Sequence, residues 1–190
     1  MTNNRKNFAI KHSNKKRKQK LILISMFIVI TTIIGISIYN FTNMEYGAKN
    51  TPDGAGKLGN DHIHASLLVR IFGDKFDFSL PAYQVKNSWI HFEARDGTTI
   101  HMHSTGVKLG YLFESLGISL TENCYIFPDQ REFCTNENYS LKFYINNMQV
   151  DSITNYVIAD NDRILISYGN ETESDINEQL MELQSQAIIN

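Results

Sequence analysis

A long apolar segment near the N-terminus is the feature that most constrains this chain. Residues 21–41 contain no charged side chain and only scattered Ser and Thr. As a helix with a rise of about 1.5 Å per residue, the segment would span about 30 Å, which is the thickness of a bilayer core. A cleaved signal peptide is the competing interpretation, but its apolar region is usually about 7–15 residues long and ends at small residues. This segment is longer and ends in Ile-Tyr-Asn-Phe, so the sequence favours a retained transmembrane helix.

The charges on the two sides of this segment predict its orientation. Residues 1–20 contain eight Lys and Arg and no acidic residue, whereas residues 45–190 contain ten Lys and Arg against twenty Asp and Glu. Basic flanks stay in the cytoplasm, so we predict a single-pass protein of the cell membrane with a cytoplasmic segment at 1–20 and an extracytoplasmic C-terminal domain. The basic run at residues 15–18 also suits nucleic acid, but a topology signal that contacts anionic lipid headgroups explains it better. The expected partner of residues 21–41 is therefore the lipid bilayer, and the acidic remainder argues against nucleic acid.

The rest of the chain divides into three parts by composition. Residues 42–60 are rich in glycine and poor in large apolar side chains, which is typical of a flexible linker. Residues 61–169 are numerous enough to bury one core and form the predicted extracytoplasmic β-rich domain. Residues 170–190 begin with capping residues and place Ile176 and Leu183 on one side of an amphipathic helical tail. This tail packs either on its own domain, which we favour, or on a second copy of the chain.

Apolar residues in the domain mostly recur with the period of two that is typical of strands. We expect strands at residues 63–71, 76–78, 90–92, 100–102, 141–145, 148–150 and 164–168, with tight turns at Gly73-Asp74, Asp96-Gly97 and Asn146-Asn147. One helix is predicted at residues 109–116, with Gly117 as its C-terminal cap. The fold class is therefore α+β and mainly β. It combines an N-terminal transmembrane helix, a small sheet of hairpins with one packed helix, for which a β-grasp-like arrangement fits, and a C-terminal amphipathic helix.

The two cysteines, Cys124 and Cys134, lie in the predicted extracytoplasmic domain, where disulfides persist. They do not form a C-x-x-C pair, and acidic residues precede both, which disfavours a reactive thiolate. We therefore predict a structural disulfide, which would stabilise a loop of this size by about 2–3 kcal/mol.

Five of the six histidines lie in the same domain, and four of these form two His-x-His pairs. In a strand, residues i and i+2 point to the same face about 6.5–7 Å apart, so two imidazoles can converge on one ion. The predicted metal ligands are His62, His64, His91, His101 and His103.

The apolar pattern also predicts the register of the hairpin that carries three of these histidines. A three-residue loop at residues 95–97, with Gly97 in the left-handed conformation, pairs Phe92 with Ile100 and Ile90 with Met102, so every apolar residue lies on one face. The opposite face then carries Trp89 with His103, His91 with His101, and Glu93 with Thr99. The sequence thus places three histidines and a carboxylate on one patch outside the core.

Three interpretations of the histidines remain: metal binding, a solvated strand face, and a charge that responds to pH. Imidazole ligation with an optional carboxylate suits Cu(II) or Zn(II) better than Ca²⁺ or Mg²⁺. No nucleophile elbow, P-loop or Rossmann glycine pattern is present, so we do not expect an enzyme. The preferred prediction is a membrane-anchored metal-binding module. The alternatives are a cell-surface scaffold that binds another protein or its own copy and, less favoured, a thiol–disulfide isomerase.

Residues 60–182 also resemble a family of membrane-anchored, mostly uncharacterised proteins of ammonia-oxidising archaea, some of which are automatically labelled protein-disulfide isomerase. The stretches that carry the resemblance are HIHASLLVRIFGDKFDFSLPAYQ, WIHFEARDGTTIHMHSTGVKLGYLFESLGI, ENCYIFPDQREFC, LKFYIN and YVIADNDRILISYGNE. The resemblance implies an extracytoplasmic location and, in copper-dependent organisms, makes copper a candidate ion. It transfers no catalytic residue, and the chain has no C-x-x-C pair to match the isomerase label.

Overall fold

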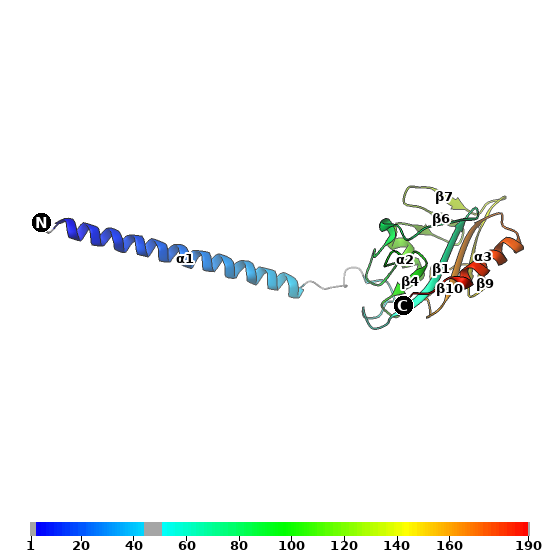
Figure 1. Cartoon of the computed structure of the whole chain (residues 1–190), viewed down its shortest axis with the longest axis horizontal. Coiled ribbons are helices and arrows are strands. Elements are labelled where there is room, and N and C mark those ends of the chain that lie inside the picture. The colour runs from blue at the N-terminus through cyan, green and yellow to red at the C-terminus, as the bar shows by residue number, and fades with distance from the viewer. Residues whose placement is uncertain (1–2, 44–50, 190) are drawn as a thin grey trace. The chain divides into compact units, whose positions relative to one another are not determined.

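The computed structural model describes residues 3–43 and 51–189, which belong to two separate compact units, residues 1–49 and residues 50–190 (Figure 1). The first unit is one helix, α1 (Asn3–Asn43). Its stretch Arg17–Tyr39 is long and apolar enough to cross a membrane, and none of it is buried by protein. Membrane anchors and signal sequences share these properties. The basic residues that precede the apolar segment continue the same helix.

The second unit is built on a seven-stranded sheet in the order β3-β4-β1-β10-β8-β9, with β2 paired to β1. The strands are β1 (Ile63–Ile71), β2 (Asp74–Lys75), β3 (Ile90–His91), β4 (Thr99–Met102), β8 (Ser140–Ile145), β9 (Met148–Val150) and β10 (Arg163–Gly169). A smaller sheet contains β5 (Ser119–Leu120), β6 (Cys124–Ile126) and β7 (Glu132–Cys134). The helices are the 3-10 turn η1 (Pro81–Tyr83), α2 (Leu109–Ser115) and α3 (Glu173–Ser185).

The centre of the large sheet is the parallel pair of β1 and β10, which lie side by side in Figure 1. Antiparallel strands extend the sheet on both sides, β4 and β3 beyond β1, and β8 and β9 beyond β10. The mainly β, α+β fold predicted from the sequence is confirmed, including both terminal helices. The strand order also fits the β-grasp-like arrangement, in which the first and last strands form a central parallel pair.

One face of the large sheet carries the main core. Apolar side chains of β1, β3, β4, β8 and β10 pack there against α2 and against the small sheet. Leu109, Leu112 and Phe113 of α2 are fully buried, as is Tyr125 of β6. Each such side chain contributes roughly 1.5–3 kcal/mol to folding by leaving water. The helix ends at Ser115, and Gly117, two residues later, has a φ of +74°, the left-handed conformation that follows a helix C-terminus.

The opposite face is covered by α3, which confirms that the amphipathic tail packs on its own domain. Leu183 of α3 is fully buried against Leu68 of β1 and Leu165 of β10. The helix begins with a capping box, in which Thr172 and Asp175 each accept a hydrogen bond from the other's backbone N–H. At its other end, Arg163 of β10 donates to the carbonyl oxygens of Leu183 and Gln186, which holds the chain after α3 on the sheet.

The turn of the histidine hairpin differs from its prediction, although the register is correct. The left-handed residues are Ala94 (φ 55°) and Arg95 (φ 61°), and the N–H of Asp96 donates to the carbonyl of Glu93. Residues 93–96 thus form a β-turn with positive φ at both central positions, inside a longer connection between the two strands. Gly97 is not left-handed; it lies so close to residues 78–79 that an added Cβ would meet the Ser79 nitrogen at 2.4 Å. The side chain of Asp96 accepts hydrogen bonds from the N–H groups of Thr98 and Thr99, which hold the chain at the start of β4.

The segment from Thr51 onwards, predicted as linker, is attached to the domain. Pro52 is buried, and the N–H groups of Gly56 and Gly59 donate to the carbonyls of Thr105 and His103. The other part of the predicted linker that precedes it, residues 44–50, lies outside the described residues. The domain therefore includes residues 51–60, which precede the predicted start at Asp61 and contact the chain just after β4.

The predicted disulfide is present between Cys124 and Cys134, which lie directly opposite each other on β6 and β7. Replacing both residues with serine is expected to lower the free energy of unfolding by about 2–3 kcal/mol, because the bond restricts the unfolded chain. Urea denaturation of the full chain in detergent measures this change. A reductant should lower the midpoint for the native chain but not for the double variant, and equal midpoints for the two oxidised proteins would refute a stabilising role.

Candidate metal centre

Three neighbouring strands place three histidines in one row across the sheet. Strand pairing sets His91 of β3 opposite His101 of β4, and the same His101 opposite His64 of β1. Because the three positions are directly paired, their side chains leave the sheet on the same face. This face is the one away from the main core, as the sequence predicted.

The two remaining histidines, His62 and His103, lie at the ends of β1 and β4, each two residues from the histidine on that strand. His62 precedes β1 and His103 follows β4, where the N–H of His103 donates to the carbonyl of Trp89. The five rings form a closed circuit, which we call the histidine circuit. Its neighbouring centroids are 4.6 Å apart for His62–His64, 4.7 Å for His64–His101, 6.1 Å for His101–His91, 5.0 Å for His91–His103 and 4.7 Å for His103–His62.

The histidine circuit is buried on one side and open on the other. The side chains of His64, His91 and His101 are at most 8% exposed, whereas His103 is half-buried and His62 is exposed. The chain that follows α3 lies over the next pair on the same face: Ser66 donates to Gln186, and Ile189 donates to Thr99. A freely solvated strand face therefore does not describe these residues.

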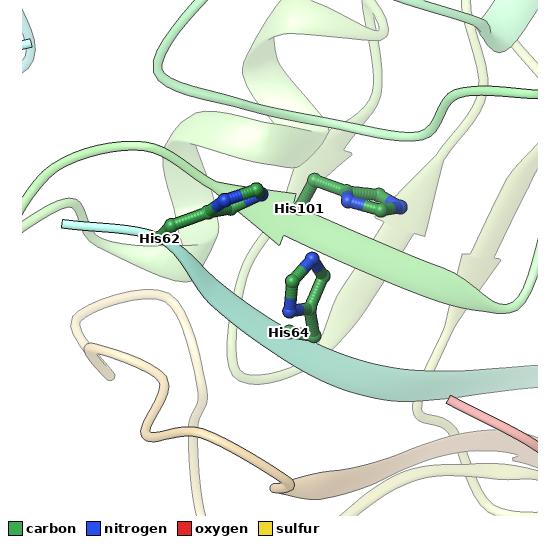
Figure 2. Close-up of side chains that lie close together, drawn as sticks. All are labelled: His62, His64 and His101. Atoms are coloured by element: carbon green, nitrogen blue, oxygen red, sulfur yellow. The ribbon is translucent and has the colours of Figure 1, made fainter. Parts of the chain in front are cut away.

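Three of the five histidines, His62, His64 and His101, are close enough to share one ion. Each offers a ring nitrogen, and these three nitrogens lie within 4.8 Å of one another (Figure 2). We call these three residues the triad. Tetrahedral zinc with bonds of about 2.0–2.1 Å needs ligand nitrogens about 3.3 Å apart.

The triad contains two polar atoms that folding has removed from water without providing a partner. Nε2 of His64 and Nδ1 of His101 are buried and make no hydrogen bond among the described residues. A buried polar atom without a partner costs about 1–3 kcal/mol, so such atoms in a native protein need an explanation. A cation bound to these nitrogens would remove this cost.

Backbone contacts fix the position of His64 while its ring stays unpaired. Its N–H donates to Asp160, and its carbonyl accepts from the N–H of Asn161. Both residues belong to the turn that precedes β10. The side chain therefore projects from a backbone that is held on both sides, which is the preorganisation that a ligand set requires.

Glu93 brings a carboxylate to the buried side of the histidine circuit. One oxygen lies 3.2 Å from Nε2 of His91, and the other lies 3.7 Å from Nδ1 of His101. The hydrogen bond with His91 lowers the pKa of Glu93, and the nearby histidines lower it further. Glu93 is therefore ionised at neutral pH and supplies negative charge beside the rings.

Burial favours the neutral form of the histidines at the centre. Loss of hydration is the main cause that lowers the pKa of His101 and of His103; neighbouring histidines lower both further, and Glu93 opposes the shift. A neutral imidazole is the form that ligates metal. These two rings therefore stay available as ligands at and somewhat below neutral pH.

All five histidines predicted from the sequence come together, but the structure divides them into the triad and the pair His91 and His103. Sequence reasoning missed Asn87, whose carbonyl lies 2.8 Å from Nδ1 of His91 and whose side chain accepts bonds from the N–H groups of Trp89 and Ile90. Asn87 lies in an irregular segment, where no periodicity indicates which groups will meet. The Asp160 contact with His64 spans 96 residues and likewise has no local signal.

Comparison with known proteins gives no match to any protein-family model, curated protein or solved structure. The function is therefore inferred from the geometry of the histidine circuit.

Proposed function

We propose that this chain is a membrane-anchored, extracytoplasmic module that binds Cu(II) or Zn(II) through the triad of His62, His64 and His101. One observation carries the proposal: two buried imidazole nitrogens have no hydrogen-bond partner, and a third histidine lies within reach of the same point. A solvated surface or a simple pH-responsive charge would leave the nitrogens of His64 and His101 in contact with water.

The chemistry of the ligands selects the class of ion. Imidazole nitrogen suits Cu(II) and Zn(II), whereas Ca²⁺ and Mg²⁺ prefer sets of oxygen ligands. Among divalent ions of the first transition row, Cu(II) binds a given nitrogen site most tightly. Copper is therefore the ion expected to give the higher affinity.

The exposure of His62 indicates how the ion enters. His64 and His101 are buried while His62 is exposed, so an ion can meet one ligand at the surface before the other two. Three protein ligands also leave a coordination position for water or for a ligand of another molecule. This favours binding and exchange of a metal over a closed structural site.

Titration of the metal-free full chain in detergent tests the proposal. We expect calorimetry to give a dissociation constant of about 1 μM or tighter for Cu(II) and Zn(II), which corresponds to about −8 kcal/mol, and no measurable binding of Mg²⁺. Affinity no tighter than about 1 mM for both transition metals would overturn the proposal.

The proposed orientation has its own test. The basic segment before the apolar stretch of α1 should stay in the cytoplasm, because basic flanks are retained there. A tag at the C-terminus should then be digested by protease added to intact cells, and a tag at the N-terminus should remain on the mature chain. Protection of the C-terminal tag would refute this orientation, and loss of the N-terminal tag would show a cleaved signal sequence.

A further inference from the structure

A polar pocket lies at the other end of β1 from the triad, between α3, the turn from β1 to β2, and the end of β10. Its volume is about 500 Å³, and its lining includes Arg70, Phe72, Glu178 and Gln179. This volume is within the range of roughly 300–1,000 Å³ that is typical of small-molecule sites. Apart from Phe72 and Gly73, every lining residue has a polar side chain. A ligand of this pocket would therefore be recognised mainly through hydrogen bonds.

Gln179 is the buried polar residue of this pocket. It lies one helical turn before Leu183, which packs on the sheet, so Gln179 faces the sheet as well. The residue is 7% exposed, and its Oε1 has no hydrogen-bond partner among the described residues. A buried amide oxygen without a partner lowers stability, so its presence in a folded domain needs an explanation.

Two more unpaired atoms lie on the sheet beneath α3. Arg70 of β1 and Ser167 of β10 are direct neighbours, each two residues beyond the pair Leu68 and Leu165 that α3 covers. Because alternate residues of a strand share a face, Arg70 and Ser167 also lie on the face that carries α3. Nε of Arg70 and Oγ of Ser167 are buried and have no partner in the described part of the chain. This region thus offers an unused acceptor on Gln179, an unused donor on Arg70 and an unused hydroxyl.

The charges around the pocket are partly balanced by ion pairs. Glu182 contacts both Arg70 and Lys75, and Glu171 lies 2.7 Å from Nζ of Lys142. Two of the four carboxylates in the lining are therefore paired already. The carboxylates oppose an anionic ligand, and the guanidinium of Arg70 opposes a cationic one. A neutral ligand fits this balance best.

Phe72 places an aromatic ring at the rim of the pocket. The residue is 52% exposed, and its ring contacts those of Phe133, Tyr139 and Tyr168 edge-on. Its φ of 53° is left-handed, a conformation that Asn and Gly adopt readily in tight hairpin turns and that bulky residues rarely adopt. A backbone outlier of this kind supports a hypothesis of function. The ring therefore has a use that the turn itself does not require.

We propose that the pocket between the β1–β2 turn and α3 binds a saccharide. A hydroxyl group both donates and accepts, so the hydroxyls of a sugar can donate to Oε1 of Gln179 and accept from Nε of Arg70. The C–H face of a sugar ring can lie against the electron-rich face of Phe72. A sugar is also neutral, as the balance of charges requires. The pocket shares no residue with the triad, so this site is independent of the proposed metal centre.

Binding to an array of oligosaccharides built from glucose, galactose, mannose and N-acetylglucosamine tests the proposal. The full chain should be kept in a detergent without a sugar headgroup, because a maltoside would compete for the pocket. We expect the native chain to bind at least one of these oligosaccharides. Calorimetry with that oligosaccharide should give a dissociation constant about tenfold higher for Gln179→Leu and for Phe72→Asn. A native chain that binds none of the array would overturn the proposal.

The two variants also separate a binding role from a structural one. Gln179→Leu removes the unpaired oxygen, and Phe72→Asn suits the left-handed backbone, so neither should lower the melting temperature as a core truncation would. Two matched controls should keep the native affinity: Gln184→Leu on the exposed side of α3, and Met148→Asn on β9. Unchanged affinity in both pocket variants would overturn the site, as would an equal loss in the controls. Metal removal should leave saccharide binding unchanged, so this site and the proposed function can fail separately.

Discussion

Replacing both His64 and His101 with alanine is expected to abolish the stabilisation of the domain by Cu(II) or Zn(II). A ligand present at 100 times its dissociation constant raises the free energy of unfolding by about 2.7 kcal/mol, which corresponds to roughly 10 °C in melting temperature for a domain of this size. Loss of two triad ligands should weaken binding by more than the roughly 10–100-fold that loss of an outer-shell contact causes. The native chain should therefore melt at a higher temperature when metal is added, and the double variant should not.

The metal-free stability of the double variant provides an independent check. Alanine removes two buried nitrogens that have no hydrogen-bond partner, which is favourable, and leaves space in a packed region, which is unfavourable. These effects oppose each other, so the metal-free melting temperature should change little compared with that of a core truncation. His12→Ala is the matched control and should keep the full response to metal. An equal response in the double variant would place the bound metal outside the triad.

Acidification is expected to release the metal, with affinity falling by about 100- to 1,000-fold between pH 7 and pH 5. Each ligating imidazole must be neutral, so below its pKa the affinity falls about tenfold per pH unit for each ligand. Burial lowers the pKa of His101, with His64, His91 and His103 acting in the same direction and Glu93 opposing them. This delays the protonation of His101, so the loss should be shallower at its start than three unperturbed histidines would give.

The same shifts predict how the metal-free domain responds to acid. The folded-state pKa of His101 and of His103 lies below the value of 6.5 for an unperturbed histidine, so the unfolded chain binds more protons in this range. Their contribution to stability is complete above about pH 6.5 and is lost as the pH falls from there toward the folded-state pKa. Melting temperatures measured with and without metal at pH 7, 6 and 5 should converge as the pH falls. Metal affinity that stays constant across this range would argue against imidazole ligands.

The local elements of the fold and the register of the histidine hairpin could be predicted from the sequence. Alternation of apolar residues placed Ile90 opposite Met102 and His91 opposite His101, because a shift by one residue would have turned the apolar side chains to the wrong face. The prediction of the turn was wrong. Gly97 is needed because the Ser79 backbone lies too close for a side chain, and it does not adopt a left-handed conformation. A glycine in a sequence does not show which of these two uses applies.

Contacts between segments that are far apart in the sequence could not be predicted, because no local pattern specifies them. The parallel pairing of β1 with β10 joins residues about a hundred positions apart, and neither strand carries a signal for its partner. The chain after α3 reaches the strand pair next to His64 and His101 through a bond from Ser66 to Gln186 and one from Ile189 to Thr99, and no local pattern predicts either contact. For this reason the sequence identified the five histidines but not the two unpaired nitrogens that make them a candidate site.

The place of β1 in the sheet affects the order in which the domain can assemble as the chain is synthesised from its N-terminus. β1 is the first strand to appear, yet its partner β10 is the last strand, so the central pair cannot close until synthesis is nearly complete. The pairing of β1 with β4 needs only the chain up to Met102, and this pairing alone unites the triad. The histidines can thus meet while β10 and α3 are still absent. An ion captured at that stage would join β1 to β4 during biogenesis, when long-range pairing is slow and exposed strand edges are prone to aggregate.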